Sequence, residues 1–197
     1  MQALSRSITF QEVPSAYKDR KLAARIIKEL ERPIFLPMGK TVPYDVKSLL
    51  SVMRVPESFL MLAWDKKKLI GYNIGAPYKN FPSWLKAKKA DVTPIDGSPA
   101  LSLPDHGTWY HDTIAVVPSK RKQGIATVMI NRLLKHAIKN GYTKWAVFLS
   151  KHSSSNAHEM YNAHPLFRKI QKAEGVMEGV VRQRGAIVMY RLYDLKV

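Results

Sequence analysis

A short basic loop that leads into a glycine is the stretch whose residue types could do chemistry most directly. It reads Arg121-x-x-Gly124-x-Ala126, and apolar residues recur at helical spacing from Ile125 onward. The first N–H groups of a helix have no intrahelical partner and carry partial positive charge. Small residues at this point let an anion approach the backbone, and Lys120 and Lys122 add mobile positive charge. The pattern predicts a binding site for a phosphate group.

Two elements must position this loop. The preceding residues 110–117 are rich in β-branched and aromatic side chains, which predicts a strand that ends at Pro118. The following residues 125–140 have the apolar spacing of a helix, and Gly141 lies where a C′ residue would close it. The Walker pattern G-x-x-x-x-G-K-[ST] and the dinucleotide pattern G-x-G-x-x-G are both absent. The alternative interpretation is a solvated basic loop between two packed elements.

The strand Ile114-Ala115-Val116-Val117-Pro118, followed by this loop, resembles the acetyl-CoA-binding motif of the GNAT superfamily of N-acetyltransferases. That motif is written [R/Q]-x-x-G-x-[G/A] after a strand of the L-x-V-x-P type. The resemblance implies acetyl-CoA as co-substrate and no metal. It implies that backbone groups of Ile114, Ala115 and Val116 hold the pantetheine amides and the acetyl oxygen. The residues implied to bind the phosphates are Arg121, Lys122, Gln123, Gly124, Ile125, Ala126 and Thr127.

The resemblance also implies a general acid. Members of the family carry an Asn followed seven residues later by a Tyr, and here Ser154 and Tyr161 have that spacing. Tyr161 would then donate a proton to the departing sulfur. Ser154, or Asn156 beside it, would contact the cofactor, although Asn156 could instead cap the helix. Without the resemblance, Tyr161 would be assigned to core packing.

A base is needed as well, because an unperturbed lysine-type amine, with a pKa of about 10.4, is mostly charged at neutral pH. The predicted strand offers Tyr110, His111 and Asp112, and alternation puts Tyr110 and Asp112 on one face and His111 on the other. GNAT enzymes often carry an acidic residue or a histidine at the position of Asp112, which could act directly or through a water. The alternatives are that Asp112 pairs with a nearby cation, or that a bulge turns His111 toward the cleft.

Composition limits the other function classes. The chain has 197 residues, 46% of them hydrophobic, and no cysteine. It is therefore expected to be globular, without disulfides, thiolate metal sites or a cysteine nucleophile. His152, His158 and His164 are spaced by six residues, which does not suit metal ligation on one helix face. No signal peptide or membrane span is predicted, so we expect a soluble cytoplasmic protein with no membrane partner.

The expected fold follows from the order of the elements. The order of the predicted elements and the resemblance to GNAT proteins together indicate an α/β (α+β) GNAT fold. It would have a mixed, mostly antiparallel sheet of six to seven strands and about four helices. Its fourth and fifth strands would splay around the cofactor. We expect a single domain, 1–197, with a long Pro-rich insertion at 77–108 and a loop marked by Pro33 and Pro37. The predicted strands are 7–13, 58–64, 69–76, 110–117, 144–150, 176–182 and 186–195, and the predicted helices are 18–30, 44–53, 125–140 and one from about 153 that stops by Pro165.

The leading functional hypothesis is transfer of an acetyl group from acetyl-CoA to an amine by direct attack in a ternary complex. The net charge of +17 favours nucleic acid or an acidic protein as a further partner, although a basic surface without a specific partner explains it equally well. One alternative is a catalytically weakened GNAT-fold module that binds such a partner. Another is an enzyme that modifies a nucleobase amine. Trp84 and the lysines at 86, 88 and 89 would then contact the nucleic-acid strand. The acceptor and the oligomeric state, a dimer included, stay open.

Overall fold

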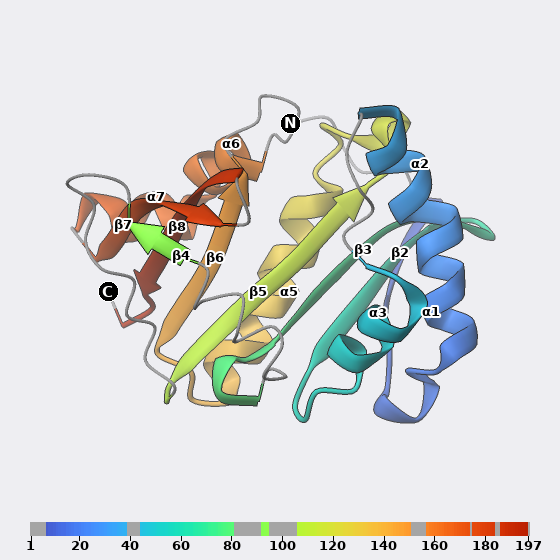
Figure 1. Cartoon of the computed structure of the whole chain (residues 1–197), viewed down its shortest axis with the longest axis horizontal. Helices are drawn as coiled ribbons and strands as arrows, with labels where there is room; N and C mark the ends of the chain where they lie inside the picture. Colours follow the sequence, from blue (N-terminus) through green and yellow to red (C-terminus); the bar gives the residue numbers. More distant parts are fainter. Residues whose placement is uncertain are drawn as a thin grey trace. The chain divides into compact units, whose positions relative to one another are not determined.

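The computed structural model describes residues 7–38, 44–80, 92–94, 106–150, 157–173, 175–183 and 186–196. The chain divides into two compact units. The first unit comprises Met1–Gly75 and Thr113–His136, and the second comprises Ala76–Asp112 and Ala137–Val197. Each unit contains β-strands flanked by helices (Figure 1), which confirms the predicted α/β class. Strand β5, Thr108–Val116, contributes residues to both units.

The strands of the first unit form an antiparallel arrangement in the order β1, β2, β3. Strand β1 is Ile8–Glu12, β2 is Phe59–Asp65 and β3 is Lys68–Pro77. Lys66 and Lys67 form the turn between β2 and β3. On the other side of β3 lies the C-terminal half of β5, where the Val117 N–H donates to the Ile70 carbonyl at 2.9 Å.

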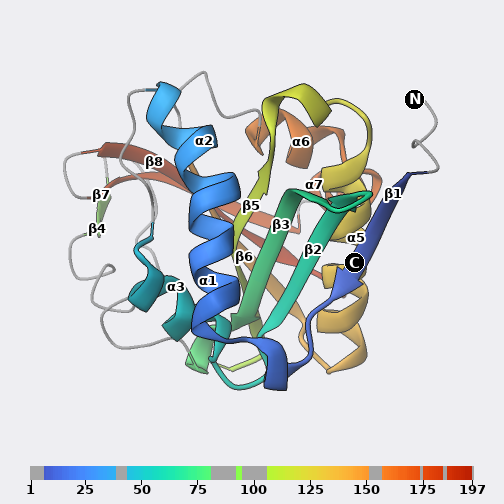
Figure 2. The same cartoon turned by 90° about the vertical axis from the view of Figure 1, so that its right-hand side faces the viewer.

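Helices cover both sides of β2 and β3. Figure 2 shows α1 (Arg20–Ile26) and α3 (Val46–Met53) on one side and α5 (Ile125–Lys139) on the other. Asp45 caps α3 by accepting from the Ser48 N–H at 2.7 Å, which satisfies one of the orphan donors of the first turn. Two short 3₁₀ turns, η1 (Ser15–Tyr17) and η6 (Pro118–Lys120), precede α1 and α5.

The prediction of a loop at Pro33 and Pro37 is wrong. After α1 the backbone continues through a π turn, η2 (Ile27–Glu31), then α2 (Arg32–Phe35) and the 3₁₀ turn η3 (Leu36–Met38). In the π turn the Arg32 N–H donates to the Ile27 carbonyl, so the regular ladder is already interrupted where Pro33 follows. The missing N–H of Pro33 therefore costs little. The π turn also directs Glu31, which is fully buried, to accept a hydrogen bond from the Tyr72 hydroxyl.

The C-terminal end of α5 is as predicted. Gly141 has a φ of 81°, its N–H donates to Ile138, and the Tyr142 N–H donates to Ala137. These two bonds are those of a Schellman motif, which satisfies the last carbonyls of the helix.

The strands of the second unit follow the order β5, β6, β8, β7, β4. Strand β6 (Lys144–Ser150) is parallel to β5, and the remaining pairs are antiparallel, so the arrangement is mixed as predicted. β7 is Val176–Gln183 and β8 is Ala186–Asp194. The short strand β4 (Val92–Pro94) lies within the Pro-rich stretch and was not predicted, nor was the turn η4 (Tyr78–Asn80).

Two helices, α6 (Ala157–Ala163) and α7 (Pro165–Lys172), complete the second unit. The predicted helix does stop before Pro165, but the sequence analysis missed that a further helix begins there. Proline suits the first helical position, because its fixed φ is already helical and the N–H it lacks has no partner there. In the part of the chain that the structure describes, no helix is long and apolar enough to cross a membrane.

Gly71 on β3 lies close to the backbone of β5. A Cβ added at Gly71 would lie 2.9 Å from the Ala115 carbonyl oxygen, which is main chain and cannot swing away. We expect Gly71→Ala to lower the free energy of unfolding by about 1–3 kcal/mol through overpacking, measured by urea denaturation. Far-UV circular dichroism should show that the folded protein keeps its secondary structure. An unchanged free energy of unfolding would mean that the β5 backbone can shift to accommodate the added methyl group.

Candidate active site

The loop before α5 has the geometry of an anion site. Lys122 and Gly124 have positive φ values of 61° and 80°, and a Cβ added at Gly124 would meet no atom within 4 Å. The first helical bond runs from the Val128 N–H to the Gly124 carbonyl at 3.0 Å. Among the described residues, no backbone carbonyl accepts from the N–H groups of residues 122–127. Several N–H groups at the helix start thus lack a backbone acceptor among the described residues, and there is open space beside Gly124, which fits a phosphate.

The basic side chains of this loop differ in whether another group of the protein holds them in place. Lys120 Nζ pairs with Asp65 Oδ2 at 2.7 Å, so it does not supply the mobile charge expected from sequence. Hydrogen bonds from Lys120 and Ser7 hold the pKa of the Asp65 carboxyl below its ordinary value. Arg121 Nε donates to the Val116 carbonyl at 3.1 Å, which fixes the guanidinium beside the loop. Arg121 and the exposed Lys122 are therefore the cations suited to a phosphate.

The backbone of β5 presents alternate residues to its two edges. The carbonyl of Ala115 faces Gly71 on β3, as does the N–H of Val117. By alternation, the N–H and carbonyl groups of Ile114 and Val116 point to the opposite edge. These two residues, and not Ala115, are placed to bond a ligand along that edge, although the Val116 carbonyl already accepts from Arg121.

Pairing between β5 and β6 ends early. The ladder runs from Thr108↔Lys144 to His111↔Val147, whereas the strands continue to Val116 and Ser150. An early end of pairing is what the expected splaying of these two strands requires.

Asp112 lies on an aromatic face of the second unit. The Tyr110 ring meets Tyr78 edge-on at 6.1 Å and Phe148 at 5.9 Å between centroids. Alternation along β5 puts Asp112, which is half-buried, on the same face as Tyr110. Burial, and then the negative charge of Asp112, raise the pKa of the Tyr110 phenol well above its ordinary value.

Tyr161 lies on the opposite face, where α6 packs. Its side chain is 1% exposed, and its hydroxyl is hydrogen-bonded to Nδ1 of His111, which is 2% exposed. The ring of Tyr161 stacks on Tyr193 at 6.0 Å, and the His111 ring lies 5.2 Å from Trp145. Burial raises the pKa of the Tyr161 phenol well above its ordinary value. The predicted alternation of β5 is therefore confirmed, and His111 reaches Tyr161 without a bulge.

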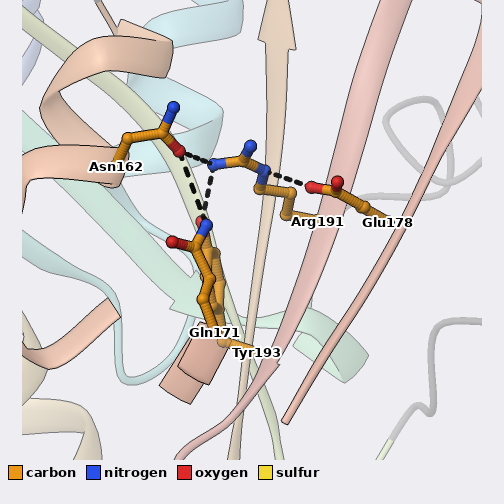
Figure 3. A network of polar contacts seen from close by, with 5 residues as sticks. All are labelled: Asn162, Gln171, Glu178, Arg191 and Tyr193. Atoms are coloured by element: carbon orange, nitrogen blue, oxygen red, sulfur yellow. Dashed lines mark hydrogen bonds and ion pairs between the residues drawn. The ribbon is translucent and has the colours of Figure 1, made fainter. Parts of the chain in front are cut away.

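A polar network around the buried side chain of Arg191 fixes the helix that carries Tyr161 (Figure 3). Arg191 on β8 is 4% exposed, and its Nη1 donates to Asn162 Oδ1 at 2.7 Å and to the Tyr193 hydroxyl at 3.2 Å. Its Nε pairs with Glu178 on β7 at 2.7 Å. Because Asn162 follows Tyr161 directly, the network ties α6 to the strands beneath it. No local pattern indicates the bond between Arg191 and Asn162, because these residues are 29 positions apart.

Several predicted residues lie outside those that the structure describes. They are Ser154 and Asn156, proposed as cofactor contacts, and Trp84 with the lysines at 86, 88 and 89, proposed to grip a nucleic acid. Of the remaining predicted site residues, the first unit holds Ile114–Val116 and the loop 121–127, and the second holds Asp112 and Tyr161. The sequence analysis missed that His111 is the partner of Tyr161. Alternation puts His111 opposite Asp112 but does not identify its partner, because His111 and Tyr161 are 50 residues apart.

Comparison with known proteins identifies the class. Residues 24–164 match the model of the acetyltransferase (GNAT) family, which is more than half of the chain. The protein belongs to this family. No curated protein sequence matches the chain closely enough to be counted as a relative.

Solved structures share the fold. A GNAT-family acetyltransferase described as putative, from Desulfovibrio desulfuricans, has a TM-score of 0.54 at 13% identity, covering 95% of this chain and 99% of its own. YncA of Salmonella typhimurium, solved with acetyl-CoA, has a TM-score of 0.55 at 13% identity, with coverages of 96% and 95%. An N-acetyltransferase from Staphylococcus aureus has a TM-score of 0.53 at 15% identity, with coverages of 95% and 98%. At these identities the likeness shows the fold alone.

Proposed function

We propose that the protein transfers an acetyl group from acetyl-CoA to an amine. The observation that carries this proposal is the row of donors at the start of α5, with Gly124 open and Arg121 fixed beside it. The loop 121–127 would hold the phosphates, and the backbone groups of Ile114 with the N–H of Val116 would bond the pantetheine arm. Acetyl-CoA supplies an activated thioester whose carbonyl accepts a nucleophile and whose thiolate departs. The acetyl-CoA bound to the Salmonella protein of the same fold supports this choice of co-substrate.

Asp112 and Tyr161 are the side chains proposed for the two proton transfers of the reaction. Asp112 can take a proton from the attacking ammonium, directly or through a water. Burial raises the pKa of the Tyr161 phenol, so this group holds its proton at neutral pH and can donate to a departing sulfur. With one group for each proton transfer, direct attack with both partners bound needs no acyl-enzyme intermediate.

The test is binding followed by transfer. Calorimetry should show acetyl-CoA binding in the micromolar range, and a screen of amines should then release CoA, detected with a thiol reagent. The chain has no cysteine, so every thiol detected comes from the reaction. A folded protein that does not bind acetyl-CoA would refute the proposal.

Asp112→Asn should lower kcat/KM about 10²-fold at neutral pH, because an amide cannot accept the proton of the ammonium. The defect should shrink as the pH rises toward about 10, since the free amine then forms without a base. The measurement is a pH profile of kcat/KM for both proteins. A defect that is equal at every pH would assign Asp112 to structure, as in the alternative interpretation.

A further inference from the structure

A carboxylate at the end of β2 contacts the loop between β5 and α5, residues 117–124. Asp65 Oδ2 pairs with Lys120 Nζ at 2.7 Å, and Asp65 Oδ1 accepts from the Ser7 hydroxyl at 2.7 Å. The adjacent backbone is held as well, because the Lys66 N–H donates to the Ser7 carbonyl at 3.3 Å. Both oxygens of Asp65 thus have partners, and the carboxylate is an acceptor held in place for Lys120.

Lys120 and Arg121 are neighbours in sequence, but they are bonded toward opposite edges of β5. The Val117 N–H donates to β3 at 2.9 Å, and the Lys120 side chain reaches past β3 to Asp65 on β2. Arg121 Nε instead donates to the Val116 carbonyl, which points by alternation to the other edge. The pantetheine arm is proposed to lie along that other edge. The charge of Lys120 is thus held on the β3 side of the loop, where it can anchor the loop.

The loop has a backbone conformation that needs support from its surroundings. Lys122 has a φ of 61°, in the left-handed region that disfavours a residue with a side chain. Such residues persist only where neighbouring contacts hold them. Two side-chain contacts directly precede Lys122, the pair between Lys120 and Asp65 and the bond from Arg121 to Val116. The first of them ties the loop to a different strand.

We propose that Asp65 is a positioning residue for cofactor binding, which holds the loop through Lys120 in the form that presents its N–H groups to the phosphates. The proposal rests on the proposed function, which puts the phosphates of acetyl-CoA at this loop. Without the pair, a smaller fraction of the molecules would have the binding form, and the apparent affinity would fall by that fraction. Neither Asp65 nor Lys120 needs to touch the cofactor for this effect.

Calorimetric titration of acetyl-CoA tests the proposal by the sign of the change. Asp65→Ala should weaken binding about 5-fold, the most that a partly exposed ion pair usually contributes. Lys120→Met should weaken it by a similar factor, and the double variant should bind no more weakly than either single variant. If Lys120 were a phosphate ligand that Asp65 withholds, Asp65→Ala would strengthen binding. Stronger or unchanged binding for Asp65→Ala, or additive losses in the double variant, would overturn the proposal.

A second exposed ion pair of the same unit provides matched controls. Arg25 Nε pairs with Glu29 Oε1 at 2.8 Å, at the junction of α1 and the π turn. Glu29→Ala changes the net charge as Asp65→Ala does, and Arg25→Met changes it as Lys120→Met does. Both controls should bind acetyl-CoA as the wild type does. Equal losses in the controls would assign the effect to net charge and overturn the proposal.

Steady-state kinetics separate positioning of the loop from a general loss of stability. Asp65→Ala should raise the KM for acetyl-CoA about 5-fold and leave kcat unchanged, because the pair supports binding and takes no part in proton transfer. A lower kcat at an unchanged KM would overturn the proposal.

Hydrogen exchange of the backbone amides, measured without any ligand, separates this proposal from the proposed function. Exchange in residues 117–127 should be faster in Asp65→Ala than in the wild type, and Glu29→Ala should leave it unchanged. Unchanged exchange in Asp65→Ala would show that Asp65 does not anchor the loop and would overturn the proposal. A folded wild type that binds no acetyl-CoA would refute the proposed function, and the exchange rates would still decide whether Asp65 holds the loop.

Discussion

Replacing Tyr161 by phenylalanine should lower kcat about 10²–10³-fold and leave the affinity for acetyl-CoA unchanged. The substitution removes one hydroxyl and keeps the ring, which stacks on Tyr193 and lies 4.8 Å from Phe167. Packing should therefore survive while the proton for the leaving thiolate is lost. Steady-state kinetics and calorimetry on the same preparation separate the two quantities.

The pH dependence of this effect has a definite sign. Burial raises the pKa of the Tyr161 phenol, so the acid form persists through neutral pH and past the ordinary value of about 10. The wild-type kcat should therefore show no loss from this group below about pH 10. Tyr142→Phe is the matched control, because it removes the hydroxyl of another buried tyrosine that packs against Trp109. Equal kinetics for Tyr161→Phe and wild type would remove Tyr161 from the mechanism.

Gly124→Glu should weaken acetyl-CoA binding at least about 100-fold, because it puts a bulky anion among the N–H groups that would hold the phosphates. Those groups lie at the start of α5, where the helix dipole favours the ligand's charge. The new carboxylate would occupy the same donors and repel the phosphates. The measurement is calorimetric titration of acetyl-CoA into the folded variant.

The chain contains an unusually close control for this experiment. Gly141 has a φ of 81° against 80° for Gly124, and at both positions an added Cβ would meet no atom within 4 Å. Gly141→Glu therefore imposes a similar backbone strain and the same change of charge, but at the other end of α5. It should bind acetyl-CoA as the wild type does. A similar loss of affinity in both variants would mean that strain or net charge, and not the phosphate site, is responsible.

Local sequence signals predicted most of the fold. The strands β1, β2, β3, β5, β6, β7 and β8 and the helices α1, α3 and α5 lie where periodicity and turn residues place them. The Schellman end of α5 followed from Gly141, and the opposite faces of Asp112 and His111 followed from alternation. These features depend on residues close in sequence. That is why they could be read without a structure.

Features that depend on distant residues could not be read in this way. Lys120 was expected to be mobile, and its pairing with Asp65 links residues that meet only in the folded chain. The His111–Tyr161 bond joins residues 50 apart, and nothing near Tyr161 specified its partner. The single-domain assignment, the acid and base roles, and a nucleic-acid partner for the charge of +17 stay predictions.

The π turn in the N-terminal helix has a consequence for alignment with relatives. A π turn is an α-helix with one residue inserted, and each helical residue accounts for about 100° of rotation. Without the widened turn, one extra residue would rotate every later side chain by about this angle. With it, the residues after Ile27–Glu31 keep the direction they would have in a regular helix one residue shorter. A family member with a regular helix should thus align with this chain only if a one-residue gap is opened within this turn. An alignment without that gap would be wrong by one residue after the turn, and the error would persist until another insertion or deletion corrects it.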